Sequence, residues 1–484
     1  MISFFKEKNN QGIYFFTLFL LLLIILFIRL YSIYILDIPL HFDEAQYWGW
    51  SKQLEWGYFS KPPILAFLIK ISTSVCGETE FCIRVSSPIL YFFSSIFIFF
   101  SSRLLTQNSY LACLTTLIFY LMPGITFSSY VITTDVPLIF FSSVFAFLII
   151  KIYKNSSVSN FYYLLVGVVF SLGFLSKYAM VYHLVSLTIL LLFYKNIRSN
   201  VLSLKSVVYI LIGLLLVVPH LYWNYNNNFV TFGHTADNAN IHRINFNFKE
   251  LFLFFLSQFI VFGVYPFYFI FKSFFAIKKQ DEEKILLYIF FVTPLVIVSI
   301  IAFFSRANAN WAVVGYPFGC ILMAKLLEKK KVFNKIYSFS SQLLLSMVII
   351  IIVISGQYTN KIDPFGKQKH ARYLANEIKR ELEAVENVAF MADDREDYAL
   401  MLFYLKDFKG KRAKWNGDNK INDHYELTTD VNNLKGNDLI FITRTKPTGE
   451  MLSRSSSSKL LKSLEFEEQN KTKKFNLYLL KNWE

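Results

Sequence analysis

Charged residues are scarce in this chain, which has 484 residues of which only 17% are Asp, Glu, Lys or Arg. A soluble domain of average composition carries roughly 25% charged residues. Hydrophobic residues make up 54% of the chain and gather in long runs. Each run is long enough to cross roughly 30 Å of hydrocarbon as a helix. The composition therefore excludes a soluble globular protein and predicts a polytopic α-helical membrane protein.

Cysteine is rare as well, and the four cysteines include no Cys-x-x-Cys pair. This spacing argues against a metal site built from thiolates. A disulfide between Cys76 and Cys82 stays open as an alternative, but we expect free thiols.

Several catalytic motifs are absent: the Gly-Lys-Ser/Thr phosphate loop, His-Glu-x-x-His and Gly-x-Ser-x-Gly. A pump driven by nucleotide hydrolysis within this chain is therefore not expected. The net charge of +15 raises the question of nucleic acid. However, the lysines lie in short loops and in the C-terminal tail rather than along one amphipathic face, so we expect no nucleic-acid partner.

Windows of about 19 residues predict eleven membrane spans. They lie near residues 12–36, 84–104, 110–124, 133–152, 161–176, 179–194, 204–223, 249–272, 285–304, 310–327 and 336–355. No small-residue cleavage site follows the basic leader, so we expect the first span to be an uncleaved anchor.

Loop charges predict the orientation. Lys and Arg are concentrated in the N-terminal leader and in the loops after the second, fourth, sixth, eighth and tenth spans. The opposite short loops hold only Lys52, Lys61, Lys70, Lys177, Arg243 and Arg306. Because cytoplasmic loops carry the positive excess, the N-terminus is predicted in the cytoplasm and the C-terminus outside.

Two outer loops and a C-terminal domain follow from this topology. Residues 37–83 form the first loop, in which PPILAFLIKISTSVC predicts a helix lying along the bilayer surface. A second loop lies near 224–248. We predict a transmembrane domain over 1–355 and a small periplasmic α/β domain over 356–484.

The C-terminal domain is expected to contain both strands and a helix. NVAFMAD, DLIFITRT and KFNLYLL are typical of strands, HARYLANEIKRELEAV is typical of an amphipathic helix, and SRSSSSK is typical of a loop.

HFDEAQYWGW places Asp43 and Glu44 just past the first span, followed by Tyr47 and Trp48. One interpretation is a helix N-terminus, where acids favour the dipole and aromatic rings mark the interface. The other is a partly desolvated carboxylate that acts as a general base.

Asp135, in SSYVITTDVPLIFF, is predicted on the same side of the membrane as Asp43. Thr-Asp-x-Pro is also a good helix start, so a capping role stays open. Two carboxylates facing one compartment can divide proton acceptance from the orientation of a partner or metal.

Four cations, Lys61, Lys177, Arg243 and Arg306, face the same compartment. Each one alone is typical of a snorkelling or topology residue. Lys177 lies between two short spans, where an ammonium needs a partner. Together with the carboxylates they indicate a site for an anion at the membrane surface, such as a lipid phosphate.

Six motifs occur in a familiar order: DEAQYWGWSKQLEWGYFSKPP, ETEFCIRVSSPIL, TTDVPLIFF, LGFLSKYAMVYH, PHLYWNYNNNFVTF and ANANWAVVGYP. In this order the chain resembles glycosyltransferase-C proteins, and in particular the bacterial branch of the dolichyl-phosphate-mannose protein mannosyltransferase family, which includes lipid A aminoarabinose transferases. The resemblance covers about residues 12 to 355 and extends weakly into the tail.

The resemblance implies a glycosyltransferase-C-like fold of the bacterial inner membrane. It implies transfer of a sugar from a polyprenyl-phosphate carrier to an acceptor on the outer face. It also assigns roles: Asp43 and Asp135 as the first and second acids with Glu44 beside Asp43, and Lys61, Lys177, Arg306 and, more loosely, Arg243 as donor phosphate-binding residues.

The expected sugar and acceptor pocket comprises Tyr47, Trp48, Tyr58, His234, His242 and Trp311. Some aminoarabinose transferases have a metal-holding glutamate where this chain has Ser60. Either histidine could be a ligand, so a divalent metal stays open and no other cofactor is expected.

We therefore expect an inverting glycosyltransferase, with lipid A as the favoured acceptor and a protein or surface glycan as others. A transporter or flippase of lipid-linked sugars is the alternative. Transporters tend to place charges at the midplane and to interrupt paired helices, whereas the charges here gather on one side.

Overall fold

The computed structural model describes residues 2–155, 157–201, 203–240, 246–278, 280–356, 358, 363–418, 420–468 and 471–484. The chain divides into two compact units. Unit 1 comprises Met1–Ile35, Lys61–Leu68 and Arg84–Ile350; unit 2 comprises Leu36–Ser60, Ile69–Ile83 and Ile351–Glu484. Most of the first outer loop is thus grouped with the C-terminal part of the chain.

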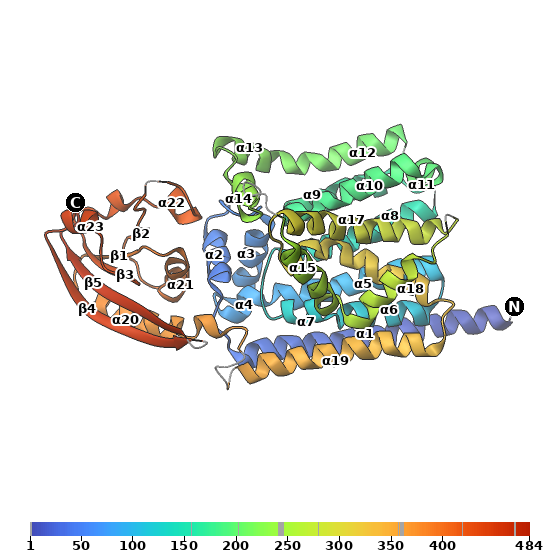
Figure 1. The fold of residues 1–484 in the computed structure, drawn as a ribbon, viewed down its shortest axis with the longest axis horizontal. Coiled ribbons are helices and arrows are strands. Elements are labelled where there is room, and N and C mark those ends of the chain that lie inside the picture. The colour runs from blue at the N-terminus through green and yellow to red at the C-terminus, as the bar shows by residue number, and fades with distance from the viewer. Residues whose placement is uncertain are drawn as a thin grey trace. The chain divides into compact units, whose positions relative to one another are not determined.

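Unit 1 is built from helices (Figure 1). These are α1 (Ile2–Leu36), α5 (Ser86–Thr106), α6 (Ser109–Tyr120), α7 (Pro123–Ser128), α8 (Asp135–Lys154), α9 (Asn160–Phe174), η1 (Tyr178–Val181), α10 (Tyr182–Phe193), α11 (Lys195–Val201), α12 (Leu204–Leu214), η2 (Leu215–Val217), α13 (Val218–Asn226), α14 (Val230–Asn238), α15 (Phe248–Val261), α16 (Val264–Phe274), α17 (Glu282–Phe304), η3 (Ala309–Gly315), α18 (Tyr316–Leu327) and α19 (Val332–Gly356).

Across the described residues, seven helices are long and apolar enough to cross a membrane, or eight if the bent pair α15 and α16 is one span. Three shorter apolar helices, at Ser109–Tyr120, Asn160–Phe174 and Tyr178–Phe193, coincide with the remaining predicted spans. Every predicted span is therefore helical, and the chain is a multi-pass membrane protein. The number of eleven spans remains a prediction.

The predicted span at 249–272 is helical but sharply bent, because α15 and α16 meet at 115°. Gly263 lies between them with φ +111°, a conformation that side chains rarely adopt. The Gln342 side chain fills the space a Cβ would need there, and its Nε2 donates to the Phe262 carbonyl at 2.8 Å. The Gln342 amide thus provides a hydrogen-bond donor for the Phe262 carbonyl where the helix is interrupted. In an apolar environment such a backbone group needs a partner within the protein.

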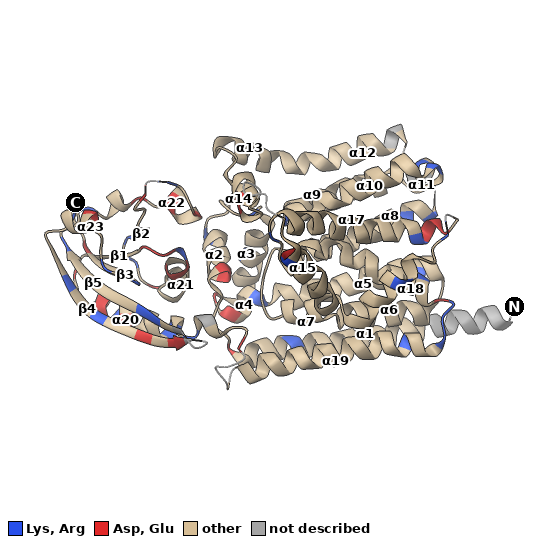
Figure 2. Cartoon of the chain, in the orientation of Figure 1, with Lys and Arg blue, Asp and Glu red and all other residues tan. Residues whose placement is uncertain are grey.

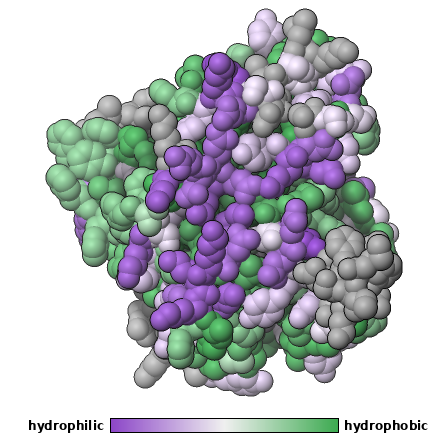
Figure 3. All heavy atoms as spheres, turned by 90° about the vertical axis from the view of Figure 1, so that its right-hand side faces the viewer, coloured by the Kyte–Doolittle hydropathy of each residue, from purple (hydrophilic) through white to green (hydrophobic). Residues whose placement is uncertain are grey.

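The two ends of unit 1 differ in charge. Lys154 at the end of α8 and Lys325 in α18 both pair with Glu283 at the start of α17. Basic residues gather at this end in Figure 2, and Figure 3 shows hydrophilic side chains spread over it. Asp135 begins α8 at the opposite end. The sequence analysis likewise predicted that the Lys- and Arg-rich loops lie at one end of the helices and Asp135 at the other. Which end faces the cytoplasm stays a prediction.

Unit 2 contains a five-stranded sheet in the order β2-β1-β3-β5-β4. Its strands are β1 (Val388–Ala392), β2 (Arg412–Lys414), β3 (Asp438–Thr443), β4 (Ser457–Glu468) and β5 (Lys471–Lys481). Strands β2, β1 and β3 are parallel, whereas β5 is antiparallel to β3 and to β4. Its helices are α2 (Phe42–Lys52), α4 (Glu80–Arg84), which ends at the boundary with unit 1, η4 (Gly366–Gln368), α20 (Ala371–Glu383), α21 (Arg395–Tyr404), α22 (His424–Thr428), η5 (Val431–Leu434) and α23 (Gly449–Ser453).

The predicted strands at β1, β3 and β5 and the predicted helix at α20 are confirmed. In α20 the buried residues Leu374, Ile378 and Leu382 recur every four positions, so one helical face is apolar. Arg372 on the same helix contacts Asp37 at 2.6 and 2.8 Å and Glu80 at 2.8 Å. This arginine holds both segments of the first loop in unit 2.

Two local predictions in unit 2 are wrong. SRSSSSK is not entirely a loop, because Ser457 begins β4 and pairs with Lys481; cross-strand pairing overrides the weak strand preference of serine. Cys76 and Cys82 form a disulfide rather than free thiols. Cys76 ends α3 (Ile64–Cys76) and Cys82 lies in α4, so the bridge joins two neighbouring helices of the first loop.

Candidate active site

In unit 1, polar side chains converge on Asp135. It is the first residue of α8, and its backbone NH donates to Thr133 Oγ1 at 3.3 Å. The preceding residue, Thr134, makes no side-chain capping bond. The Asp135 side chain is only 9% exposed and points to residues far along the chain. The simple capping interpretation therefore does not describe this carboxylate.

Lys177 is the first partner of Asp135. It lies between α9 and η1 in extended backbone, at φ −159° and ψ 135°. Its Nζ is 2.6 Å from Asp135 Oδ1, and the lysine side chain is 18% exposed. The sequence analysis expected the Lys177 ammonium to need a partner between two short apolar spans. That partner is the charged, largely buried Asp135 carboxylate.

Asn310 is the second partner, and the sequence analysis missed it. Its Nδ2 donates to Asp135 Oδ2 at 2.6 Å from η3. The only available signal was the motif ANANWAVVGYP, in which a role was predicted for Trp311 and none for Asn310. Since both oxygens of Asp135 are engaged, this carboxylate is suited to hold Lys177 in place rather than to accept a proton.

The remaining predicted residues of unit 1 are Arg306, Trp311, Lys61, His234, His242 and Arg243. Arg306 is exposed and bonds Asn238 through Nε at 3.0 Å and through Nη2 at 2.6 Å. Trp311, next to Asn310, packs against a buried cluster that includes Phe254 and Val298. Lys61 and His234 are half-buried, whereas His242 and Arg243 lie outside the described residues.

In unit 2, α2 begins with the acidic pair. His41 Nδ1 accepts the Asp43 backbone NH at 3.2 Å, and Glu44 Oε2 accepts the His41 backbone NH at 2.9 Å. This is a capping box with a buried glutamate. Glu44 therefore fixes the helix start, while the Asp43 side chain remains 42% exposed and accessible to a substrate.

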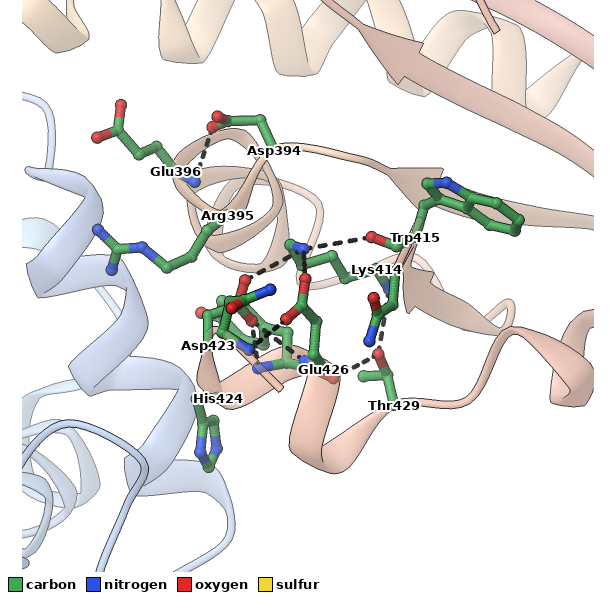
Figure 4. Close-up of polar contacts among 12 residues, drawn as sticks. Asp394, Arg395, Glu396, Lys414, Trp415, Asp423, His424, Glu426 and Thr429 are labelled. Atoms are coloured by element: carbon green, nitrogen blue, oxygen red, sulfur yellow. Dashed lines mark hydrogen bonds and ion pairs between the residues drawn. The ribbon is translucent and has the colours of Figure 1, made fainter. Parts of the chain in front are cut away.

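Arg395, a residue of the C-terminal domain that the sequence analysis did not single out, lies beside Asp43. It begins α21, which packs against α2. Its Nη1 is 2.6 Å from Gln46 Oε1 and 3.4 Å from Asp43 Oδ1. The guanidinium lies 5.0 Å from the centre of the Phe42 ring. Figure 4 shows this side chain extending away from Asp394 and Glu396.

The predicted pocket aromatics of the first loop are packed inside unit 2. Tyr58 stacks on Trp50 at 4.5 Å, and Trp48 meets Phe403 edge to face at 5.1 Å. Burial raises the pKa of Tyr58 to about 12, so its phenol stays neutral. Tyr47 is also buried. These rings hold α2 rigidly, and their contact with a sugar stays a prediction.

A metal site is not supported by the residues that the structure describes, among which no three His, Cys, Asp or Glu side chains group to hold an ion. Lys177 and Asn310 occupy the oxygens of Asp135. Among the described residues, the donor set around the two carboxylates does not fit a divalent cation.

Asp135, Lys177 and Lys61 belong to unit 1, and Asp43 with Glu44 belongs to unit 2. Each unit brings part of the predicted set together. The predicted meeting of Asp43, Lys61 and Asp135 around one substrate stays a prediction.

The chain is similar to known glycosyltransferases in sequence. Residues 60–223 match the family model described as dolichyl-phosphate-mannose-protein mannosyltransferase. Lipid A galacturonosyltransferase RgtD of Rhizobium johnstonii is 27% identical over 374 residues, 75% of this chain and 77% of the relative. Lipopolysaccharide core galacturonosyltransferase RgtA of the same organism is 26% identical over 194 residues, 40% of this chain and 38% of the relative.

The structure is similar to ArnT from Cupriavidus metallidurans bound to undecaprenyl phosphate, with a TM-score of 0.66. The match covers 95% of this chain and 97% of ArnT at 12% identity, so it is a likeness of fold. The predicted fold class is confirmed: a helical membrane protein with a small C-terminal sheet domain. The chain thus has a glycosyltransferase-C fold and is a glycosyltransferase that resembles the dolichyl-phosphate-mannose protein mannosyltransferase family.

Proposed function

We propose that this protein is an inverting glycosyltransferase that moves a sugar from a polyprenyl-phosphate carrier to lipid A at the periplasmic face of a bacterial inner membrane. The observation that carries the proposal is the largely buried Lys177, held by Asp135 at 2.6 Å in a chain similar to lipid A galacturonosyltransferase RgtD. A cation held in place in this way suits the phosphate of a lipid carrier.

Lys177 is assigned to the departing phosphate. A polyprenyl phosphate is already a good leaving group, so the main requirement is to stabilise its negative charge. An ammonium preorganised by Asp135 meets this requirement in a setting largely shielded from water. Lys61 and Arg306 are proposed to add positive charge to the same phosphate.

Asp43 is assigned to the acceptor. Its carboxylate takes the proton from an acceptor hydroxyl as the hydroxyl oxygen forms a bond to the anomeric carbon. The bond between that carbon and the phosphate oxygen breaks, and its electron pair leaves with the phosphate. Attack opposite the carrier inverts the anomeric configuration. The capping box that fixes α2 keeps Asp43 in a defined place.

Lipid A is proposed because RgtD, whose name specifies that acceptor, matches most of the chain. A protein hydroxyl or another envelope glycan would use the same donor chemistry. The proposed topology, with the N-terminus cytoplasmic and the C-terminal domain periplasmic, places Asp43 on the acceptor's side of the membrane.

The test compares the lipid A mass spectrum of cells with and without the gene, and then the purified protein with polyprenyl-phosphate sugars. We expect lipid A to lose the mass of one sugar in cells without the gene. The purified protein should transfer the sugar in vitro, and Lys177→Met should slow this transfer about 100- to 1,000-fold. Lys329→Met, at an exposed lysine of the opposite end, is the matched control. Binding of the donor without cleavage of its sugar–phosphate bond would instead favour a transporter or flippase.

A further inference from the structure

Arg372, Arg444 and Arg395 of unit 2 contact carboxylates in different ways. Arg372 grips Asp37 with two nitrogens at 2.6 and 2.8 Å. Arg444 grips Asp397 in the same way, at 2.8 and 2.9 Å. Such two-point contacts are the usual arrangement for a structural arginine–carboxylate pair. Arg395 departs from it.

Arg395 uses only one of its nitrogens. Nη1 donates to the neutral amide oxygen of Gln46 at 2.6 Å, while its 3.4 Å separation from Asp43 Oδ1 exceeds normal hydrogen-bond length. Nε and Nη2 make no hydrogen bond to any residue that the structure describes. Arg395 is therefore held in position by the Gln46 amide and by an ion pair with Asp43 at 3.4 Å, while Nε and Nη2 stay available to a ligand.

Neighbouring residues keep Arg395 in this state. The adjacent acids Asp394, Glu396 and Asp397 are paired with Arg444 at 3.3, 3.6 and 2.8 Å. Figure 4 shows Arg395 pointing away from Asp394 and Glu396. The Phe42 ring lies 5.0 Å from the guanidinium, which restrains it further without removing charge. The side chain is 33% exposed, so an incoming ligand can reach it.

We propose that Arg395 binds the carboxylate of a uronic acid as the transferred sugar. This inference rests on the proposed function, since it specifies the donor of that reaction. Two parallel N–H groups match a carboxylate. In a hexuronic acid the carboxylate is attached to a ring carbon close to the anomeric carbon. A carboxylate on Arg395 would therefore keep the reacting carbon within about one sugar ring of Asp43.

The similarities point to the same class of sugar. RgtD and RgtA are both galacturonosyltransferases by name, and galacturonic acid carries such a carboxylate. A phosphate of the acceptor is the other anion that two N–H groups would suit, and the experiment separates the two sources.

The experiment measures kcat/KM of the full-length protein with polyprenyl-phosphate galacturonate and with its neutral counterpart, polyprenyl-phosphate galactose. Wild type is expected to favour the uronate donor at least tenfold. Because a charge-assisted hydrogen bond is lost, Arg395→Gln is expected to lower kcat/KM for the uronate roughly tenfold to a hundredfold. The neutral donor should change less than about threefold.

Two further variants complete the design. Arg395→Lys keeps the charge but loses the two-point contact, so it should retain an intermediate preference for the uronate. It also provides the donor ratio if the glutamine variant does not fold. Arg380→Gln, at an arginine that is 72% exposed, is the matched control and should behave as wild type.

Three outcomes would overturn the proposal. Equal losses with both donors would mean that Arg395 acts by positioning Asp43 or α2. A loss that disappears with dephosphorylated lipid A would assign Arg395 to the acceptor phosphate. A wild-type preference for the neutral donor would exclude a uronate. Failure to transfer any sugar from any polyprenyl-phosphate donor would instead reject the proposed function itself.

Discussion

Replacing Asp135 and Lys177 singly and together separates stability from catalysis. Asp135→Leu leaves the Lys177 ammonium and the Asn310 amide without their acceptors, and Lys177→Met leaves the carboxylate without its cation. The two side chains are only 9% and 18% exposed. Removing one member of a buried ion pair costs about 3–5 kcal/mol of folding free energy.

The double variant should lose less stability than either single variant. With both charges removed, the main remaining cost is the Asn310 amide without an acceptor, about 1–3 kcal/mol. Asp135 and Lys177 should therefore couple by at least about 3 kcal/mol. Activity should not recover, because loss of a preorganised group that stabilises developing charge lowers kcat by about 100- to 1,000-fold.

The assay combines SDS-induced unfolding in mixed micelles with turnover of a polyprenyl-phosphate sugar. Lys329→Met again serves as the control for removing a lysine. Two results would refute this reasoning. If the stability losses of the two single variants simply add in the double variant, Asp135 and Lys177 do not interact. If the double variant regains activity together with stability, Lys177 does not act on the phosphate.

Further predictions concern unit 2. Asp43→Asn should lower kcat about 100- to 10,000-fold, the range for a general base, with an unchanged unfolding midpoint; full activity would remove Asp43 from the mechanism. Replacing Cys76 and Cys82 by serine opens a short loop, with a sequence separation of 6, and should lower the free energy of unfolding by about 2 kcal/mol, measured by denaturant titration. Burial lowers the pKa of His424 to about 4. Between about pH 6.5 and 4 the unfolded state therefore binds more protons than the folded state. The free energy of unfolding falls as the pH is lowered through this window. His424→Phe should remove up to about 3 kcal/mol of that fall; identical pH profiles would contradict it.

The hydrophobic pattern of a short stretch of sequence was enough to predict those helices and strands whose formation depends mainly on that stretch. The long apolar run that became α1 and the short apolar runs that became β1 and β3 carry their own signal of length and composition. The bend between α15 and α16 was missed because a hydropathy average does not register Gly263, whose positive φ decides the geometry. Strand β2 is three residues long and has no pattern of its own.

The site was predicted in part for the same reason. Asp135 and Lys177 could be chosen because a charge next to apolar spans is costly and therefore informative. Asn310 and Arg395 carry no such signal. Their contacts to Asp135 and Asp43 join residues 175 and 352 positions apart, which only the folded chain reveals.

The contacts of Arg372 determine when unit 2 can finish folding during synthesis of the chain. Its partner Glu80 lies 292 residues earlier in the chain. At about 5 to 20 residues per second, a ribosome needs roughly 15 to 60 s to make that interval. Throughout this time the newly made first loop lacks the helix that later secures it, and its own disulfide is among the few restraints already within reach. Shortening the protein from its C-terminus is therefore expected to loosen the segment that carries Asp43, far away in sequence.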